Sequence, residues 1–174
     1  RLLDLAKKNN ARFLFFSSTK VYGEIPREII QVPETYNGNC PTTGVRSVYG
    51  ESKRLGETIC SLYRRDYNVK VYIARISHVY GPGISIHDEG VLGNFIRKAL
   101  TGKKIKFLNQ DKSVKTFGYI ADIIRMLILI ISNGKDMIYN VGGADTVSLH
   151  EFAGEVDRCC NVPVILPKQK SNLK

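Results

Sequence analysis

The sequence lacks tryptophan, and it lacks any apolar run long enough to span a bilayer. A transmembrane helix needs about 18 or more consecutive apolar residues. The most apolar stretch, residues 120–131, is interrupted by Asp122 and Arg125. We therefore expect no membrane-spanning segment and no membrane partner.

Cysteine and histidine are scarce, and their spacing matches no metal or disulfide pattern. The cysteines are Cys40, Cys60, Cys159 and Cys160, and the histidines are His78, His87 and His150. No C-x-x-C pair or Cys/His ligand cluster, the usual signature of a zinc site, occurs among them. We expect free thiols and no bound metal, which fits a protein of the reducing cytoplasm.

Acidic residues are fewer than basic residues in this sequence. The 174 residues include 26 Lys and Arg against 16 Asp and Glu, which gives a net charge of +10. Several lysines cluster, at positions 103, 104, 106, 112 and 115 and again at 168, 170 and 174. This excess favours an anionic partner such as a phosphorylated ligand. No zinc-finger, helix-turn-helix or aromatic-interleaved pattern accompanies the lysines, so we do not expect a nucleic acid.

The remaining composition indicates a globular α/β protein, with 43% hydrophobic residues. Periodicity and turn residues predict strands at 12–16, 69–75, 105–108, 137–141 and 162–166, and helices at 1–9, 47–66, 91–100, 122–132 and 149–159. Residues 24–46 are rich in Pro, Gly, Asn and Thr and predict a long loop. Strands that alternate with helices in this way favour a parallel sheet.

The helix predicted over 47–66 places Tyr49 and Lys53 four residues apart. At that spacing two side chains leave the same face of a helix. A cation beside a phenol favours the phenolate, and a phenol poised in this way can take a proton from an alcohol. Alone, the pair is also compatible with an ordinary solvated helix face.

The context of that pair is more specific. Strand 12–16 runs into Ser-Ser-Thr-Lys-Val-Tyr-Gly at 17–23, the Tyr-x-x-x-Lys helix follows, and strand 69–75 leads into Tyr-Gly-Pro at 80–82. This order resembles the extended short-chain dehydrogenase/reductase family, and within it the NAD-dependent nucleotide-sugar epimerases, dehydratases and decarboxylases. The resemblance covers nearly the whole chain. It implies the C-terminal portion of a Rossmann-like doubly wound parallel sheet plus a small mixed α/β substrate-binding subdomain, with NAD as cofactor and a nucleotide sugar as substrate.

The resemblance also assigns the domains. Residues 1–83 correspond to the second half of the NAD-binding domain, and residues 84–174 mainly to the substrate-binding subdomain, with 114–141 returning toward the Rossmann core. The family opens with a Gly-x-x-Gly-x-x-Gly turn that holds the dinucleotide pyrophosphate, and this sequence has none. We therefore expect the 174 residues to be a fragment that is inactive by itself.

Roles for individual residues follow from the resemblance alone. The implied catalytic residues are Ser18, Tyr49 and Lys53; the implied cofactor-binding residues are Ser17, Tyr49, Lys53 and Ile76; the implied substrate-binding residues are Thr19, His78, Asn94 and Lys115. Two of these positions depart from the family pattern, since His78 stands where Asn is usual and Lys115 where Arg is common.

The departures bear on the reaction. In the family, the 4,6-dehydratases carry an acidic pair where this chain has Thr19 and Lys20, and the decarboxylases carry Glu at position 20 and Arg at position 115. Loss of these carboxylates favours simple 4-epimerisation of a UDP- or dTDP-sugar, whereas segment 87–95 resembles the substrate loop of the decarboxylases. Decarboxylation, dehydration, binding without catalysis and a charge-driven anion-binding role stay open. We also expect a homodimer, formed through the 47–66 helix or an open strand edge.

Overall fold

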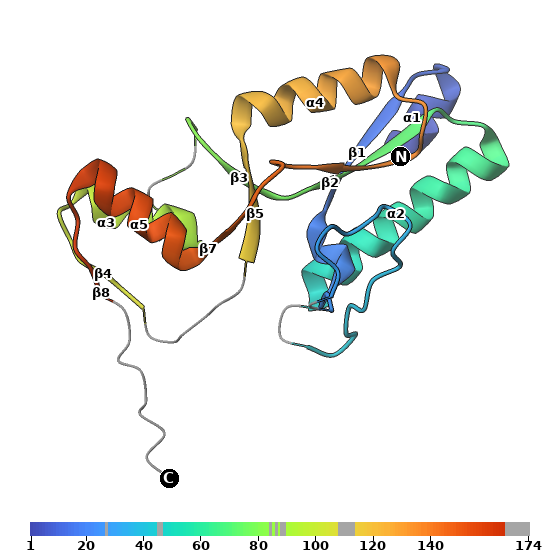
Figure 1. Cartoon of the computed structure of the whole chain (residues 1–174). Coiled ribbons are helices and arrows are strands. Elements are labelled where there is room, and N and C mark those ends of the chain that lie inside the picture. The colour runs from blue at the N-terminus through green and yellow to red at the C-terminus, as the bar shows by residue number, and fades with distance from the viewer. Residues whose placement is uncertain are drawn as a thin grey trace, which may run out of the picture. The chain divides into compact units, whose positions relative to one another are not determined.

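The computed structural model describes residues 1–26, 28–44, 47–83, 85, 87, 90–107 and 114–165, and only the backbone of Val91. The chain divides into two compact units, Arg1–Val79 with Gly118–Gly143, and Tyr80–Phe117 with Ala144–Lys174 (Figure 1). The sequence predicted a single boundary at 83/84 and a return over 114–141. The structure divides the chain at 79/80, 117/118 and 143/144.

A three-stranded parallel sheet in the order β1-β2-β6 forms the centre of the first unit. Its strands are β1 (Phe13–Ser18), β2 (Val71–Ile76) and β6 (Ile138–Val141). Parallel neighbours need a crossover, and helices lie between these strands in the sequence. The predicted α/β fold with a parallel sheet is therefore confirmed. In the described part of the chain, β1 has a strand neighbour on one side only.

Helices cover the two faces of this sheet (Figure 1). The face toward α2 (Ser47–Tyr67) and α1 (Leu2–Lys8) carries Val71 and Ile73, which pack with Cys60. The opposite face, toward α4 (Ile120–Asn133), carries Tyr72 and Ala74. Strand residues alternate between faces, so β2 contributes to both cores and is buried along its length.

The second unit contains α3 (Val91–Leu100), α5 (Leu149–Cys160) and a parallel pair of β4 (Ile105–Lys106) with β8 (Val164–Ile165). It also contains β5 (Val114–Tyr119) as far as Phe117, and this part of β5 pairs antiparallel with β7 (Thr146–Ser148). Its core is made of Phe95, Ile105, Ala153 and Val162. The two remaining elements of the described chain are the 3-10 helix η1 (Thr19–Tyr22) and strand β3 (His78–Tyr80).

Most predicted elements are present, with shifted ends. Ser148 caps α5, in a capping box with Glu151. The helix predicted to begin at Asp122 begins at Ile120, and η1, β3, β5 and β7 are not among the elements predicted above. Lys112, Lys168, Lys170 and Lys174 of the lysine clusters, and Leu166 of the last predicted strand, lie outside the described residues. No helix in the described ranges is both long and apolar enough to cross a membrane.

Candidate functional site

Tyr49 and Lys53 lie in the first two turns of α2, on one face of the helix. The Nζ atom of Lys53 is 5.7 Å from the centre of the Tyr49 ring. The same ammonium donates a 2.8 Å hydrogen bond to the main-chain carbonyl oxygen of Phe16, near the carboxyl end of β1. Tyr49 is 52% exposed, so its ring faces solvent. The pair therefore combines an accessible phenol with a cation anchored to the central sheet.

Glycine lets α2 approach the sheet closely. A Cβ on Gly56 would lie 2.3 Å from Cζ of Phe15, and a Cβ on Gly50 would lie 2.7 Å from Sγ of Cys40. Both distances are far inside van der Waals contact. The absence of a side chain at Gly56 lets α2, and with it Lys53, lie close to β1, and its absence at Gly50 lets α2 lie against Cys40 of the 24–46 loop.

Two serines end β1 and have different surroundings. The Ser17 hydroxyl is buried and donates a 2.5 Å hydrogen bond to Oε1 of Glu57 on α2. The Ser18 Oγ accepts a 3.3 Å hydrogen bond from the backbone N–H of Lys20 and caps η1. Alternation along β1 places the two side chains on opposite faces of the strand. Ser18 lies at the end of the strand beside Ile76 in the sheet register.

A buried ion pair connects α2 to the middle strand. The Arg75 guanidinium donates from Nε and Nη2 to the two carboxylate oxygens of Glu57, at 3.0 and 2.7 Å. Its Nη1 donates to the hydroxyl of Tyr22 at 3.0 Å and to the carbonyl of Glu34 at 2.9 Å. Burial alone would lower the pKa of Arg75, and the hydrogen bonds with Glu57 and Tyr22 outweigh it, so the pKa is raised. Arg75 is therefore a fixed cation and not a proton donor.

The same network holds the 24–46 loop against the sheet. Tyr22 donates a 2.6 Å hydrogen bond to Oδ1 of Asn140 on β6. The Nδ2 of Asn140 donates to the carbonyl of Val32, and its backbone N–H donates to the carboxylate of Glu34. Ser17, Arg75 and Asn140 are direct neighbours across the three strands. This row of residues across the sheet thus contacts both α2 and the 24–46 loop.

On the α4 side, the ends of the strands border an apolar groove of about 410 Å³, whose lining includes Phe16, Ile76 and Val79. Phe16 is 52% exposed. At the carboxyl end of β2, the hydroxyl oxygen of Ser77 is buried and has no hydrogen-bond partner among the described residues. An unpaired buried hydroxyl costs free energy unless a ligand or water satisfies it. In the described part of the chain, the unpaired edge of β1 agrees with the open strand edge expected from the sequence.

The sequence profile of the NAD dependent epimerase/dehydratase family matches residues 1–142. The chain belongs to this family. Among curated relatives, UDP-glucuronic acid decarboxylase 3 of Arabidopsis thaliana is 35% identical over 92% of this chain and 46% of its own length. UDP-glucuronic acid decarboxylase 1 of Xenopus tropicalis is 32% identical over 87% of this chain and 36% of its own length. The chain spans less than half the length of these relatives.

Solved structures of epimerases have the same fold. UDP-glucose 4-epimerase of Thermus thermophilus, crystallised with NAD, superposes with a TM-score of 0.80 at 25% identity, over 95% of this chain and 54% of that one. UDP-N-acetylglucosamine 4-epimerase of Methanobrevibacter ruminantium superposes with a TM-score of 0.84 at 21% identity, over 98% and 54%. The predicted family is therefore confirmed, together with the Rossmann-like fold.

In this family member, the predicted site residues fall into both units. The first unit holds Ser17, Ser18, Thr19, Tyr49, Lys53, Ile76 and His78, and the second holds Asn94 and Lys115. The structure records no hydrogen bond between Ser18 and Tyr49 within the described residues, so their predicted contact stays a prediction, as do the roles of Thr19 and His78. The Ser17 hydroxyl donates its hydrogen bond to the Glu57 carboxylate within the protein itself.

Sequence reasoning missed the supporting network of Glu57, Tyr22 and Asn140. One signal was available for Glu57, which follows Lys53 by four residues on the same helix and so shares its face. Tyr22 and Asn140 gave no comparable signal, because their partners lie 53 to 118 positions away in the sequence.

The residues present fit one end of a dinucleotide. Tyr49 and Lys53 supply a hydroxyl and an ammonium at the end of the sheet. The buried hydroxyl oxygen of Ser77, which has no hydrogen-bond partner in the part of the chain that the structure describes, supplies a polar atom at the same end. Ligands of open α/β sheets bind beyond the carboxyl ends of the strands, which is where these groups lie. A nicotinamide ribose is therefore compatible with Tyr49 and Lys53.

Proposed function

We propose that this chain carries the catalytic helix of an NAD-dependent nucleotide-sugar 4-epimerase. The observation that supports the proposal best is the Tyr49–Lys53 pair, with its ammonium on the Phe16 carbonyl and its phenol exposed to solvent. A UDP- or dTDP-linked sugar is the proposed substrate. Free thiols on Cys159 and Cys160, both exposed, support a reducing compartment such as the cytoplasm.

In the proposed reaction, Tyr49 takes the proton from the C4 hydroxyl of the sugar. Lys53 stabilises the phenolate and, in the same position, holds a ribose hydroxyl of the cofactor. Ser18 orients the reacting hydroxyl. The chemistry that NAD supplies when bound is acceptance of a hydride from C4 and its later return. Tyr49 returns the proton to O4 after the sugar has presented its other face.

Epimerisation is proposed over decarboxylation because of Lys20 and Lys115. Lys20 lies in η1, directly after the strand that ends in Ser18, and Lys115 lies in β5. Neither can act as the carboxylate or the guanidinium that the decarboxylase pattern has at these positions. The second candidate is UDP-glucuronate decarboxylation, and the 32–38% identity to proteins of that name favours it.

The two candidates are distinguished by the product. The protein, expressed with any coding sequence that precedes these residues in its gene, is incubated with NAD and either UDP-glucose or UDP-glucuronate. We expect conversion of UDP-glucose to UDP-galactose, seen in the proton NMR spectrum, and no release of CO₂ from UDP-glucuronate. Release of CO₂ would contradict the epimerase proposal and support decarboxylation. Binding of both sugars without turnover would support a nucleotide-sugar-binding module without catalysis.

We also propose that the protein is a homodimer that pairs through α2. Val48, Leu55, Ile59 and Leu62 follow one another at spacings of seven, four and three and are 82%, 61%, 42% and 39% exposed. Such a stripe on an otherwise polar helix favours burial against a partner. Light scattering should give the mass of a dimer, and Leu55→Glu should give that of a monomer. A wild-type monomer at high concentration would exclude this interface.

A further inference from the structure

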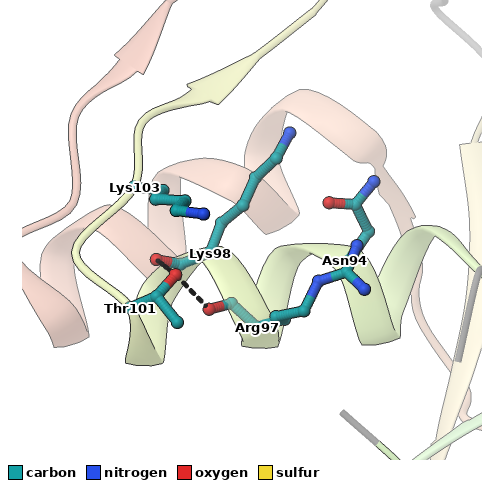
Figure 2. Close-up of a pocket in the computed structure, with 5 residues that line it drawn as sticks. All are labelled: Asn94, Arg97, Lys98, Thr101 and Lys103. Atoms are coloured by element: carbon teal, nitrogen blue, oxygen red, sulfur yellow. Dashed lines mark hydrogen bonds between the residues drawn. The ribbon is translucent and has the colours of Figure 1, made fainter. Parts of the chain in front are cut away.

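A hollow in the second unit runs along α3 and the turn that follows it. Figure 2 shows its lining as sticks: Asn94, Arg97, Lys98, Thr101 and Lys103. The Oδ1 atom of Asn94 is buried and has no hydrogen-bond partner among the described residues. Because Asn94 is one of the predicted substrate-binding residues, the hollow belongs to the substrate binding already predicted. The polar cluster around Tyr22 is a different feature, which lies in the first unit.

Tyr22 is buried at the end of η1, the short 3-10 helix that begins directly after Ser18. Its hydroxyl accepts a 3.0 Å hydrogen bond from Nη1 of Arg75 and donates a 2.6 Å hydrogen bond to Oδ1 of Asn140. The Arg75 guanidinium also lies over the Tyr22 ring, with its Cζ atom 4.8 Å from the ring centre. Arg75 and Asn140 are direct neighbours on β2 and β6, so the Tyr22 hydroxyl ties the end of η1 to the central sheet.

The short helix η1 also contacts α2, beside Tyr49. Arg54 of α2 donates a 3.1 Å hydrogen bond from Nη1 to the carbonyl of Val21 in η1. A Cβ on Gly50, the residue after Tyr49, would lie 3.3 Å from the carbonyl oxygen of Lys20. The backbones of η1 and of the first turn of α2 therefore pass each other closely, next to the residue that carries the exposed phenol.

Ser18 depends on the same short helix for its orientation. It is the N-cap residue of η1, and its Oγ accepts a 3.3 Å hydrogen bond from the backbone N–H of Lys20. A shift of η1 would therefore move the Ser18 hydroxyl with it. The helix α2 is held on β2 separately, by the ion pair of Glu57 with Arg75. A shift of η1 would thus change the distance between Ser18 and α2.

We propose that Tyr22 is a positioning residue, which sets the distance between the hydroxyls of Ser18 and Tyr49 by holding η1 on the sheet. This assignment rests on the proposed function, in which Ser18 and Tyr49 handle the reacting hydroxyl, and it is the same for epimerisation and for decarboxylation. Tyr22 itself contacts neither substrate nor cofactor. A misplacement of about 1 Å among reacting groups can cost about 100-fold in rate. Loss of the Tyr22 hydroxyl should therefore slow the chemical step and leave substrate binding nearly unchanged.

Tyr22→Phe, made in the protein expressed with any coding sequence that precedes these residues, removes only the hydroxyl. We expect kcat to fall about 10- to 100-fold on whichever sugar the wild type converts, with KM changed by less than about twofold. Tyr139→Phe is the matched control, because the Tyr139 hydroxyl also makes two hydrogen bonds, accepting from the backbone N–H groups of Lys135 and Asp136 at 2.8 Å. Both variants should melt at a lower temperature than the wild type, and Tyr139→Phe should keep the wild-type kcat.

A double variant separates positioning of Ser18 from a general loosening of the protein. Ser18→Ala/Tyr22→Phe should be no more than about twofold slower than Ser18→Ala, because the serine hydroxyl that Tyr22 positions is then already absent. A further tenfold loss in the double variant would overturn the proposal, since the Tyr22 hydroxyl would then act on the reaction independently of Ser18.

NMR spectra of isotope-labelled protein provide a readout that needs no turnover. Tyr22→Phe should shift the signals of the Ser18 amide and the Tyr49 ring, whereas Tyr139→Phe should leave both in place. Unmoved signals in Tyr22→Phe, or a kcat within about twofold of the wild type, would overturn the proposal. Shifted signals in a protein that converts neither sugar would support positioning by Tyr22 and contradict the proposed function, so the two failures are distinguishable.

Discussion

Glu57 holds Arg75 through both carboxylate oxygens while the two side chains are only 12% and 9% exposed. The pair joins α2, which carries Tyr49 and Lys53, to the middle strand of the sheet. Because Arg75 also donates hydrogen bonds to the Tyr22 hydroxyl and to the carbonyl of Glu34, the position of α2 is coupled to that of the neighbouring loop. The first prediction concerns this ion pair.

Arg75→Met should lower the free energy of unfolding by about 3–5 kcal/mol, because it leaves the Glu57 carboxylate buried without its partner. Urea denaturation followed by circular dichroism measures this. The matched control is Arg158→Met, which breaks the exposed Glu155–Arg158 pair and should change the free energy of unfolding far less. Equal costs for the two variants would mean that the buried pair contributes no more than a surface one.

Tyr49→Phe should reduce turnover of the proposed epimerase by about 10²–10⁴-fold, the usual contribution of a positioned acid or base. The ring is 52% exposed, so loss of its hydroxyl should leave the melting temperature nearly unchanged. Steady-state kinetics and a thermal melt together separate the two effects. Wild-type turnover in this variant would remove Tyr49 from the mechanism.

Gly56→Ala should destabilise the protein by about 1–3 kcal/mol, as overpacking does, because the new methyl group would meet the ring of Phe15. Gly154→Ala provides the control. Gly154 also lies in a helix, but a methyl group added there would meet no neighbouring side chain or strand within 4 Å, so alanine should stabilise by about 0.5–1 kcal/mol. Opposite signs in the two unfolding experiments are expected, and a stabilising Gly56→Ala would show that α2 can move away from β1.

Burial raises the pKa of the Cys60 thiol from 9.0 to about 11. The unfolded chain therefore loses this proton at a lower pH than the folded protein does. The contribution of the neutral thiol to stability is complete below about pH 9 and is lost as the pH rises toward 11. Cys60→Ala should flatten the fall of the urea midpoint between pH 9 and 11, whereas Cys159→Ala, at an exposed site, should leave it as in the wild type. A wild-type slope in Cys60→Ala would contradict the shift.

The 174-residue chain should bind NAD with a dissociation constant no better than about 1 mM, equivalent to about 4 kcal/mol. The sequence holds the candidate nicotinamide end, Tyr49 and Lys53, but no Gly-rich turn for the pyrophosphate. A few hydrogen bonds at one end must offset the cost of immobilising the ligand. Calorimetric titration measures this affinity, and micromolar binding would show that the cofactor is held by residues other than those assigned here.

The sequence predicted the features that depend on local patterns. The apolar strands, the amphipathic helices and the Tyr49–Lys53 spacing all follow from periodicity, and the structure has them. Strand β3 was missed because it is only three residues long and follows the end of β2 almost directly. The Tyr22–Asn140 hydrogen bond was missed because it joins residues 118 positions apart, and no pattern within a short window records such a pair.

The hollow along α3 was likewise only partly predictable from local patterns in the sequence. The sequence identified Asn94 by resemblance and the lysines by their charge, as two unrelated observations. Helical geometry brings Asn94, Arg97, Lys98 and Thr101 along one stretch of α3, and the following turn adds Lys103. Periodicity could have grouped the helical residues in advance, whereas the buried, unpaired Oδ1 of Asn94 is visible only in three dimensions.

The hydrogen bonds that Asn140 makes with Val32 and Glu34 have a consequence for engineering and for evolution. The 24–46 loop is an obvious segment to exchange when a new substrate preference is sought. Its conformation, however, is specified partly by a strand more than a hundred positions away. Without asparagine at position 140, a transplanted loop would lose the side-chain hydrogen bond to the carbonyl of Val32. The other bond comes from the backbone N–H of position 140, so it needs a carboxylate at position 34 of the loop. Loop and strand should therefore be exchanged as one unit, and they are expected to change together among natural variants.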